Sequence, residues 1–349
     1  MELLYEYGLF LAKAITIVLT IAAILITVIA LSSKQKHKKG EMELTDLSKQ
    51  LNQSKKSIEE QLLTSHQLKE RQKKDKKIKK EKDKIAKKAA KNGQGEDTLP
   101  QLYVVDFKGS IDAKEVSSLR EEVTAILSVA TEKDEVFLRL ESGGGMVHGY
   151  GLASSQLQRL KDHNIPLTVS VDKVAASGGY MMACVADKII AAPFAILGSI
   201  GVIAQIPNFN KLLKKHDIEF EQLTAGEYKR TITMFGENDQ AGRDKFKQEL
   251  QETHDLFKQF VSLHRRQIDI DKVATGEHWY GLQAIERDLV DSISTSDDYL
   301  LSQLENRHII QLKYTARTKL TDKIAHAASI SVENSLLKFM NFNANKFFK

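Results

Sequence analysis

The chain has 349 residues, 42% of them hydrophobic and 28% charged, which suits one large or two small globular domains with extensions. Its only cysteine, Cys184, excludes an internal disulfide and argues against a thiolate metal site, and four prolines are too few for a proline-rich stalk. The formal net charge of +5 originates in one basic segment and not in the chain as a whole.

Residues 1–33 predict a transmembrane anchor. The stretch AITIVLTIAAILITVIAL at 14–31 has no charge, and with the flanking GLFLAK it is long enough to cross about 30 Å of hydrocarbon. A cleaved signal peptide is the alternative, but Glu2 and Glu6 stand where such a peptide has a basic start. Four lysines between 34 and 39 follow the span, and by the positive-inside rule they favour a cytoplasmic location for the bulk of the chain.

Residues 34–98 predict a basic, polar spacer. Between Lys69 and Lys91, thirteen Lys or Arg residues stand against four Asp or Glu, a local net charge of +9, so the rest of the chain sums to −4. Sparse apolar residues among Glu, Lys, Gln and Ala favour a solvated helix that fades into disorder. The lysines suit anionic lipid headgroups, and because no aromatic residue interleaves them we expect no specific nucleic-acid binding.

Residues 99–300 predict an α/β domain, and residues 301–349 a C-terminal extension. Short apolar runs predict strands, and apolar residues at helical spacing between them predict helices. This alternation implies a mostly parallel sheet with helices on its faces. The apolar stretch 189–206 contains a proline and two glycines, so we assign it to the sheet and its loops and not to a second membrane span. We expect strands at 101–107, 136–142, 166–172 and 187–193, and helices at 111–130, 148–164, from 177 onward and at about 239–266.

Two junctions between a strand and a helix carry unusual residues. The first, SGGGMVHGYG at 142–151, is a glycine cluster whose exposed N–H groups suit an anion or an oxyanion. The second places Ser177 directly before Gly178 and Gly179 at the start of a helix. Sites form in such sheets where strands end and helices begin, so this serine has the setting of a nucleophile on a tight turn. The alternative is that Ser177 only caps the helix.

A nucleophilic serine needs a base, and the residues alone leave its identity open. Four histidines are candidates, although two of them lie on a long amphipathic helix where a surface or core role is expected. The other option is a lysine kept neutral by an apolar, desolvated site, and a chain with 51 Lys and Arg residues offers many. The histidine candidates are His148, His254, His264 and His278.

Four motifs stand in order along residues 101–295. They are ESGGGMVHGYG, VDKVAASGGYMMACVADKIIAAPFAILGSIGV, TAGEYKRTITMFGEN and ATGEHWYGLQAIERDLVD. In order and spacing they resemble the signal peptide peptidase A (SppA) family of serine proteases. The resemblance implies a Clp-protease-like, crotonase-related α/β fold and a catalytic Ser-Lys dyad in place of a triad. It implies neither a cofactor nor a metal.

The resemblance also assigns roles to individual residues. It makes Ser177 the nucleophile and Lys229, in AGEYKR, the general base. One position departs from the family pattern, because the common S-P-G-G reads SGGG at 142–145. Glycine in place of proline loosens this loop and leaves the identity of its oxyanion donor open. The implied oxyanion donors are the backbone N–H groups of Gly178 and Gly144, and the implied groove residues are Gly145 and Ser199.

The function implied is hydrolysis of peptide bonds by a membrane-anchored endopeptidase. The family's targets suggest signal peptides or misfolded membrane or envelope proteins as substrates, and relatives of this fold form homo-oligomeric rings. We expect a single-pass protein of the bacterial inner membrane, with the charge rule favouring a cytoplasmic catalytic domain and the periplasmic side left open. Two other classes stay open: a catalytically inactive membrane scaffold, and a crotonase-like module that binds an acyl ligand without a nucleophile.

Overall fold

The computed structural model describes residues 40–64, 66–70 and 99–315, together with residues 7–11, 13, 16, 17, 20, 73, 77 and 80. The chain divides into two compact units. One comprises Met1–Glu41 with Thr315–Lys349, and its described residues before Gly40 are helical. The other, Met42–Tyr314, holds the sheets and the helices that surround them. The transmembrane segment expected at 14–31 lies almost entirely outside the described residues.

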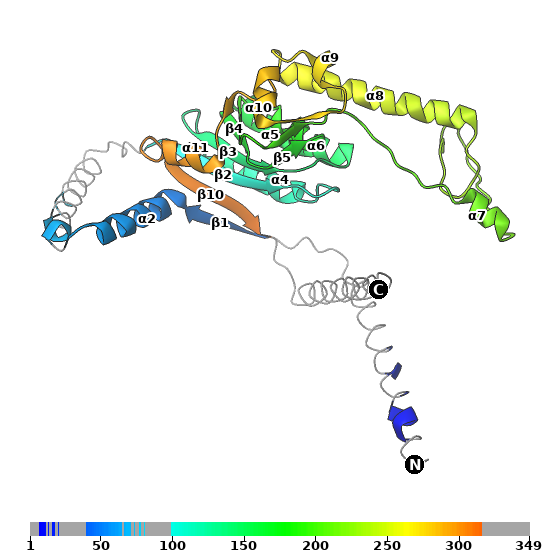
Figure 1. Ribbon diagram of the computed structural model, residues 1–349, viewed down its shortest axis with the longest axis horizontal. Helices are drawn as coiled ribbons and strands as arrows, with labels where there is room; N and C mark the ends of the chain where they lie inside the picture. Colours follow the sequence, from blue (N-terminus) through cyan, green and yellow to red (C-terminus); the bar gives the residue numbers. More distant parts are fainter. Residues whose placement is uncertain are drawn as a thin grey trace, which may run out of the picture. The chain divides into compact units, whose positions relative to one another are not determined.

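A seven-stranded sheet forms the centre of the larger unit, in the order β1-β10-β2-β3-β4-β6-β9 (Figure 1). Every pair from β10 to β9 is parallel, which confirms the mostly parallel sheet expected from the alternating pattern. The strands are β1 (Glu41–Asp46), β10 (His308–Thr315), β2 (Gln101–Lys108), β3 (Glu135–Glu141), β4 (Leu167–Val171), β6 (Lys188–Ala191) and β9 (Ser292–Ile293).

Helices cover both faces of this sheet. Successive strand residues point to opposite faces, and in the central strands the residues on both faces are apolar and are buried by helices. In β2, Tyr103 and Val105 join the main core with α4 (Val116–Val129), α5 (Val147–Asp162) and α6 (Gly178–Ala183). Leu102 and Val104 alternate with them and pack with Leu300 of α11 (Ser296–Gln303). Strands buried on both faces read as continuous apolar runs, and this explains why they could be located from the sequence.

A second, three-stranded sheet lies beside the first and carries the start of α6. It has the order β5-β7-β8, formed by β5 (Val174–Ala176), β7 (Ile196–Gly198) and β8 (His278–Tyr280). Ser142, at the end of β3, forms an isolated parallel bridge with Ala175 of β5. The bridge brings together the two junctions identified in the sequence, the glycine cluster that starts at Ser142 and the turn at Ser177. The apolar stretch 189–206 enters β6 and β7, as expected.

A long helix, α8 (Gln240–His264), is fixed to this body at its C-terminal end. Phe257 and Val261 are buried in the main core, and the Arg265 guanidinium pairs with Asp291 at 2.9 Å. The helix has 25 residues, which corresponds to about 37 Å at 1.5 Å per residue. The short elements around it are α7 (Asn210–Lys215), α9 (Ile270–Val273), α10 (Gly281–Ala284) and the 3-10 helix η1 (Ile285–Arg287).

Residues 202–239, which we call the arm, connect β7 to α8. The arm folds on itself: Phe235 packs against Phe209 and Phe220, with ring centroids 6.1 and 5.7 Å away. It is attached to the first turns of α8, where the Lys245 Nζ lies 5.3 Å from the centroid of the Tyr228 ring. In Figure 1 the end of α8 that leads to α7 is the end opposite α9 and α10.

The ends of the compact unit differ from the boundaries expected at residues 99 and 300. Strand β1 and helix α2 (Leu47–Leu62) precede residue 99, in the segment read as a spacer, and β10 follows residue 300, in the segment read as an extension. Both strands pair in the sheet. Two side-chain contacts link the same segments: the Ser48 hydroxyl of α2 accepts the N–H of Ile309 at 2.9 Å, and the His308 ring lies 3.3 Å from Asp46. Among the described residues, no helix has the length and hydropathy to cross a membrane.

The docking of α2 on β10 predicts a stability effect at Ser48. Ile309 is fully buried, so removing the Ser48 hydroxyl leaves its N–H without an acceptor. We expect Ser48→Ala to lower the free energy of unfolding by about 1–3 kcal/mol, the cost of a buried unpaired donor. Urea unfolding of the full chain, followed by the fluorescence of Trp279, measures it. Ser57→Ala, on the exposed side of the same helix, is the control, and equal values for the two variants would contradict the docking.

Candidate active site

Ser177 occupies a strained backbone position between β5 and α6. Its dihedral angles are φ +51° and ψ −118°, a region that residues other than glycine rarely adopt. Such a conformation costs about 1–3 kcal/mol and persists where the surrounding structure enforces it, often at functional sites. Here the Ser177 N–H donates to the Gly198 carbonyl at 2.8 Å, and the Ser177 carbonyl accepts from the Met181 N–H at 3.0 Å.

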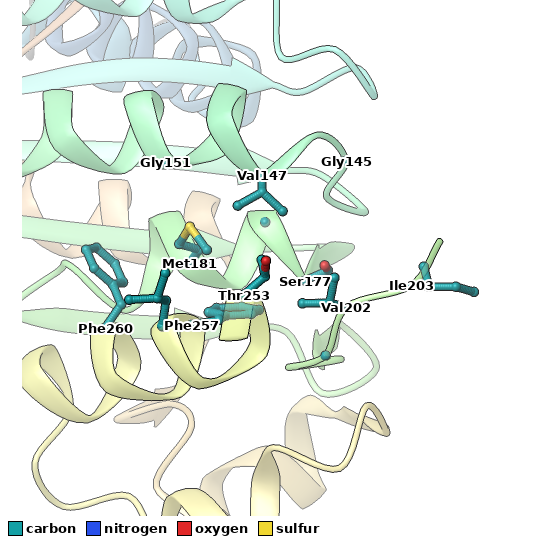
Figure 2. A pocket seen from close by; sticks show the side chains of 13 residues that line it. Gly145, Val147, Gly151, Ser177, Met181, Val202, Ile203, Thr253, Phe257 and Phe260 are labelled. Atoms are coloured by element: carbon teal, nitrogen blue, oxygen red, sulfur yellow. The ribbon is translucent and has the colours of Figure 1, made fainter. Parts of the chain in front are cut away.

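The side chain of Ser177 does not cap α6, although the residue is at the N-cap position. It makes no capping hydrogen bond, and its hydroxyl has no hydrogen-bond partner within the described part of the chain. The hydroxyl instead lines a pocket (Figure 2). The capping interpretation of this serine is therefore wrong, and its position calls for another explanation.

The glycine cluster at 142–145 lies directly against Ser177. A Cβ on Gly144 would lie 2.8 Å from the Ser177 Cβ and 2.6 Å from the Gly178 nitrogen, and the φ of Gly144 is +85°. A Cβ on Gly179 would lie 2.5 Å from the Ser142 carbonyl oxygen. Glycines on both sides of the contact thus allow two backbone segments to approach to a separation that side chains would prevent.

Of the two expected oxyanion donors, Gly178 has a free N–H in the structure. As the first residue of α6 it has no acceptor within the helix, and it donates no hydrogen bond to any other described residue. The N–H of Gly144 is engaged, because it donates to the Ser142 hydroxyl at 3.1 Å. Gly145, expected in the groove, lines the pocket.

The pocket beside Ser177 is a cavity of about 260 Å³ with a mainly apolar lining. Its walls come from α5, α6, α8, the first arm residues Val202 and Ile203, and Gly201, which precedes the arm. Figure 2 shows Ser177 and Val202 near the Ile203 end, with Phe260 at the opposite end. Apart from Ser177, the lining residues with side chains are Val147, Met181, Val202, Ile203, Thr253, Leu256, Phe257 and Phe260.

Lys229 is not brought to Ser177 within one copy of the chain. It is exposed, it does not line the pocket, and it lies in the arm next to Tyr228, which packs on Lys245 of α8. The first residue of α8 that lines the pocket is Thr253, eight residues after Lys245, which is about 12 Å along the helix axis. The part of the arm that holds Lys229 is thus fixed to α8 away from the pocket.

The remaining candidates do not supply a base within the chain either. None of the four histidines lines the pocket, and His148 and His278 are exposed. Ser199, expected in the groove, follows β7 with φ +51°, and its N–H donates to the Glu277 carbonyl at 2.7 Å. It does not line the pocket, but its neighbour Gly198 holds the Ser177 N–H.

The long helix expected at about 239–266 was a candidate to cover the site or to meet another subunit, and as α8 it contributes one wall of the pocket. Tyr150 is a feature of this site that was missed in the sequence. Tyr150 is fully buried beneath the site, and a Cβ on Gly178 would collide with its ring. The glycines that make room for this tyrosine, Gly109 and Gly178, lie far from it in the chain, so no local pattern signalled the contact.

Comparison with known proteins identifies the family. Residues 2–157 match Peptidase family S49 N-terminal, and residues 159–309 match Peptidase family S49. A Haemophilus influenzae protein named "Probable protease SohB" is 49% identical over 348 residues, covering 99% of both chains. A protein of the same name from Buchnera aphidicola subsp. Schlechtendalia chinensis is 50% identical over 305 residues, covering 87% of this chain and 100% of its own.

A more distant relative gives a shorter match. "Protease 4" of Haemophilus influenzae is 29% identical over 206 residues, covering 57% of this chain and 33% of its own. The mostly parallel α/β sheet fits the fold of these peptidases, and the resemblance drawn from the four motifs is confirmed at the level of the family. The chain belongs to peptidase family S49 and is a protease of the SohB type.

Proposed function

We propose that this protease is a serine endopeptidase with Ser177 as its nucleophile and Lys229 as its general base. The observation that carries the proposal is the state of Ser177: it is strained, it caps nothing, and its unbonded hydroxyl lines an apolar pocket under a glycine loop. A serine held at this cost without a structural partner is suited to react. The fold we propose is of the Clp-protease and crotonase-like kind.

The proposed reaction is acyl transfer through two tetrahedral intermediates. The neutral amine of Lys229 takes the Ser177 proton while the Ser177 Oγ attacks the peptide carbonyl, and the resulting ammonium gives that proton to the leaving amine. Water then attacks the acyl-enzyme and loses a proton to the lysine, and as the acid leaves, the lysine ammonium returns that proton to the Ser177 Oγ. The Gly178 N–H and a donor from the glycine loop stabilise the oxyanion, each contributing on the order of 3 kcal/mol.

We propose that Lys229 reaches Ser177 from a second copy of the chain. The part of the arm that carries it is fixed to α8 away from the pocket of its own copy, and it exposes large apolar side chains. Leu223 is 88% exposed, and Leu212 and Ile218 are each 53% exposed, which favours a protein partner over solvent as their environment. An arm that docks on an identical neighbour, repeated around a closed ring, would bury these side chains and complete every site.

The substrate that fits this site is an extended peptide with an apolar side chain next to the cleaved bond. The pocket is apolar and begins at Ser177, so it accepts that side chain. Residues 201–203 line its edge without secondary structure, and their backbone groups form no hydrogen bond among the described residues. A peptide can pair with such a segment as an added strand. Signal peptides and misfolded membrane or envelope proteins provide segments of this kind.

A side chain placed at Gly151 of α5 should make the pocket shallower and change which substrate side chains it accepts. Gly151 lines the pocket, and a Cβ there would meet nothing within 4 Å. We expect Gly151→Leu to lower kcat/KM at least about tenfold for peptides with Leu or Phe before the cleaved bond, and much less for peptides with Ala there. A peptide series measures it. Leu152→Ala, outside the pocket on the same helix, is the control, and an equal loss for all peptides would contradict this assignment.

The anchor and the location are proposals from the sequence. We propose that residues 14–31 span the bacterial inner membrane once and that the basic segment 69–91 lies near anionic headgroups. The lysines that follow the span favour a cytoplasmic catalytic unit. Protease accessibility in spheroplasts measures the side: digestion of the unit from outside would place it in the periplasm.

Cleavage of casein by the full chain in detergent tests the proposed function. We expect the wild type to cleave and Ser177→Ala to be inactive while folding and assembling normally. A wild type that folds and assembles but does not cleave would contradict the proposal and favour an inactive scaffold or a module that binds an acyl ligand.

A further inference from the structure

The position of the glycine loop over Ser177 needs an explanation. Gly143 is exposed, and a Cβ there would meet no atom within 4 Å, so no packing holds the first glycine. Gly143 and Gly145 donate no backbone hydrogen bond in the described part of the chain. Yet Gly144 must stay in place, because it lies against both Ser177 and Gly178. Gly144 itself donates one hydrogen bond, from its N–H to the Ser142 hydroxyl, while the end of the loop is held by the Met146 N–H, which donates to the Ile111 carbonyl at 2.8 Å.

The hydrogen bond from the Gly144 N–H to the Ser142 hydroxyl is the first of a chain that leads into the core. The Ser142 hydroxyl lies 2.5 Å from the Tyr150 hydroxyl, which in turn lies 2.8 Å from the Ser110 carbonyl oxygen. Ser142 is 2% exposed, and Tyr150 is fully buried. A Cβ on Gly109 would collide with the Tyr150 hydroxyl, so the glycine makes the space that this chain occupies.

The direction of every proton in this chain is fixed by its ends. A carbonyl oxygen only accepts, so the Tyr150 hydroxyl donates to Ser110 and must accept from Ser142. The Ser142 oxygen, having donated its own proton, accepts from the Gly144 N–H. Burial raises the pKa of Tyr150, which keeps the phenol protonated and able to donate. Loss of the Ser142 hydroxyl therefore removes the acceptor of the Gly144 N–H, and loss of the Tyr150 hydroxyl removes the group that orients this acceptor.

The ring of Tyr150 contacts the other half of the site. A Cβ on Gly178 would overlap the ring, so the ring packs directly on the residue that follows Ser177. Tyr150 thus contacts Gly178 with its ring and holds Gly144 through Ser142 with its hydroxyl. No other side chain described in the structure makes both contacts.

We infer that Tyr150 is a positioning residue for the oxyanion site: through Ser142 it fixes the glycine loop relative to Gly178 and so sets the space in which the substrate carbonyl is held. This role rests on the proposed function of Ser177. It deepens that proposal, because it explains how a loop of three glycines keeps a defined position. It assigns the hydroxyls of Tyr150 and Ser142 to transition-state geometry and not to substrate binding.

Removal of the Tyr150 hydroxyl alone tests the inference, with the full chain in detergent. Tyr150→Phe keeps the ring on Gly178 and should lower kcat about 10- to 100-fold with KM within twofold, since small misplacements near reacting atoms have effects of this size. The affinity for a peptide aldehyde, whose adduct places an oxyanion in the same site, should fall in parallel. Ser142→Ala should lower kcat similarly. Because both hydroxyls act through one chain of hydrogen bonds, the kcat of the double variant should be no lower than that of the less active single variant.

Tyr180→Phe is a matched control for the loss of a buried hydroxyl. Tyr180 is fully buried and lies on α6, and its hydroxyl donates to the Leu289 carbonyl at 2.9 Å, away from the glycine loop. It should lower the Tm about as much as Tyr150→Phe but leave kcat within twofold of the wild type. Equal losses of kcat in the two variants, or a Tyr150→Phe variant with wild-type kcat, would overturn the inference.

Amide exchange gives a readout that does not depend on catalysis. The Gly144 amide should exchange at least tenfold faster in Tyr150→Phe and Ser142→Ala than in the wild type, with no change in Tyr180→Phe. If the wild type does not cleave casein, the proposed function fails and exchange alone decides. Faster exchange in Tyr150→Phe would then still support loop positioning by Tyr150, and unchanged exchange would overturn it.

Discussion

Ser177→Gly should abolish proteolysis and stabilise the fold at the same time. Loss of a nucleophile in a serine protease lowers kcat by roughly 10⁶-fold. The same change relieves a backbone with φ +51° and removes a hydroxyl that has no hydrogen-bond partner in the described structure. After allowing for the greater freedom of glycine in the unfolded chain, we expect the free energy of unfolding to rise by about 1 kcal/mol.

Two variants separate these effects, with casein cleavage and urea unfolding as the measurements. Ser177→Ala keeps the strain and should be inactive without any gain in stability. Asp288→Gly, at an exposed position with φ +57° outside the pocket, should gain stability and keep full activity. A Ser177→Gly variant that is less stable than Ser177→Ala would contradict the backbone strain at this position, because both variants lack the hydroxyl and differ only in whether the strain is relieved.

Mixing two inactive variants should restore activity. Lys229→Ala removes the proposed base and should lower kcat by about 10²- to 10⁴-fold. If Lys229 acts on the Ser177 of a neighbouring copy, rings formed by co-expressing Lys229→Ala with Ser177→Ala contain sites in which both residues are intact. With random assembly from equal amounts, about one site in four has both, so we expect about a quarter of wild-type activity.

Double-mutant chains provide the control for this experiment. Chains carrying both substitutions, co-expressed with Ser177→Ala chains, contain no intact serine and should stay inactive. Inactive mixed rings of the two single variants would show that the dyad forms within one copy and that the arm must move toward its own pocket. Wild-type activity in Lys229→Ala alone would exclude Lys229 as the base.

The core strands and the nucleophile could be predicted because their signals are local. Strands β2 and β3 are buried on both faces and read as apolar runs, and Ser177 stands out among small residues at a junction. The two glycine junctions were recognised separately, and parallel pairing explains why they meet. These features depend on residue type and periodicity alone.

Other parts depend on long-range contacts that periodicity does not encode. Strand β1 reads EMELTD and lies at the sheet edge with three of its six residues exposed and none buried, so it carries no apolar run, and it was assigned to the spacer. The path of the arm depends on contacts such as that of Tyr228 with Lys245, which no local pattern predicts. Tyr150 was missed because its role comes from residues 40 positions earlier and 28 positions later in the chain.

The most direct test of the account is to label the full chain in detergent with a fluorophosphonate probe and map the modified residue by mass spectrometry. Only an activated serine reacts with such a probe. We expect one modified residue, Ser177, and no label in Ser177→Ala or Lys229→Ala. A folded, assembled wild type that stays unlabelled, or that is labelled at another serine, would contradict the claim that Ser177 is the nucleophile of this protease.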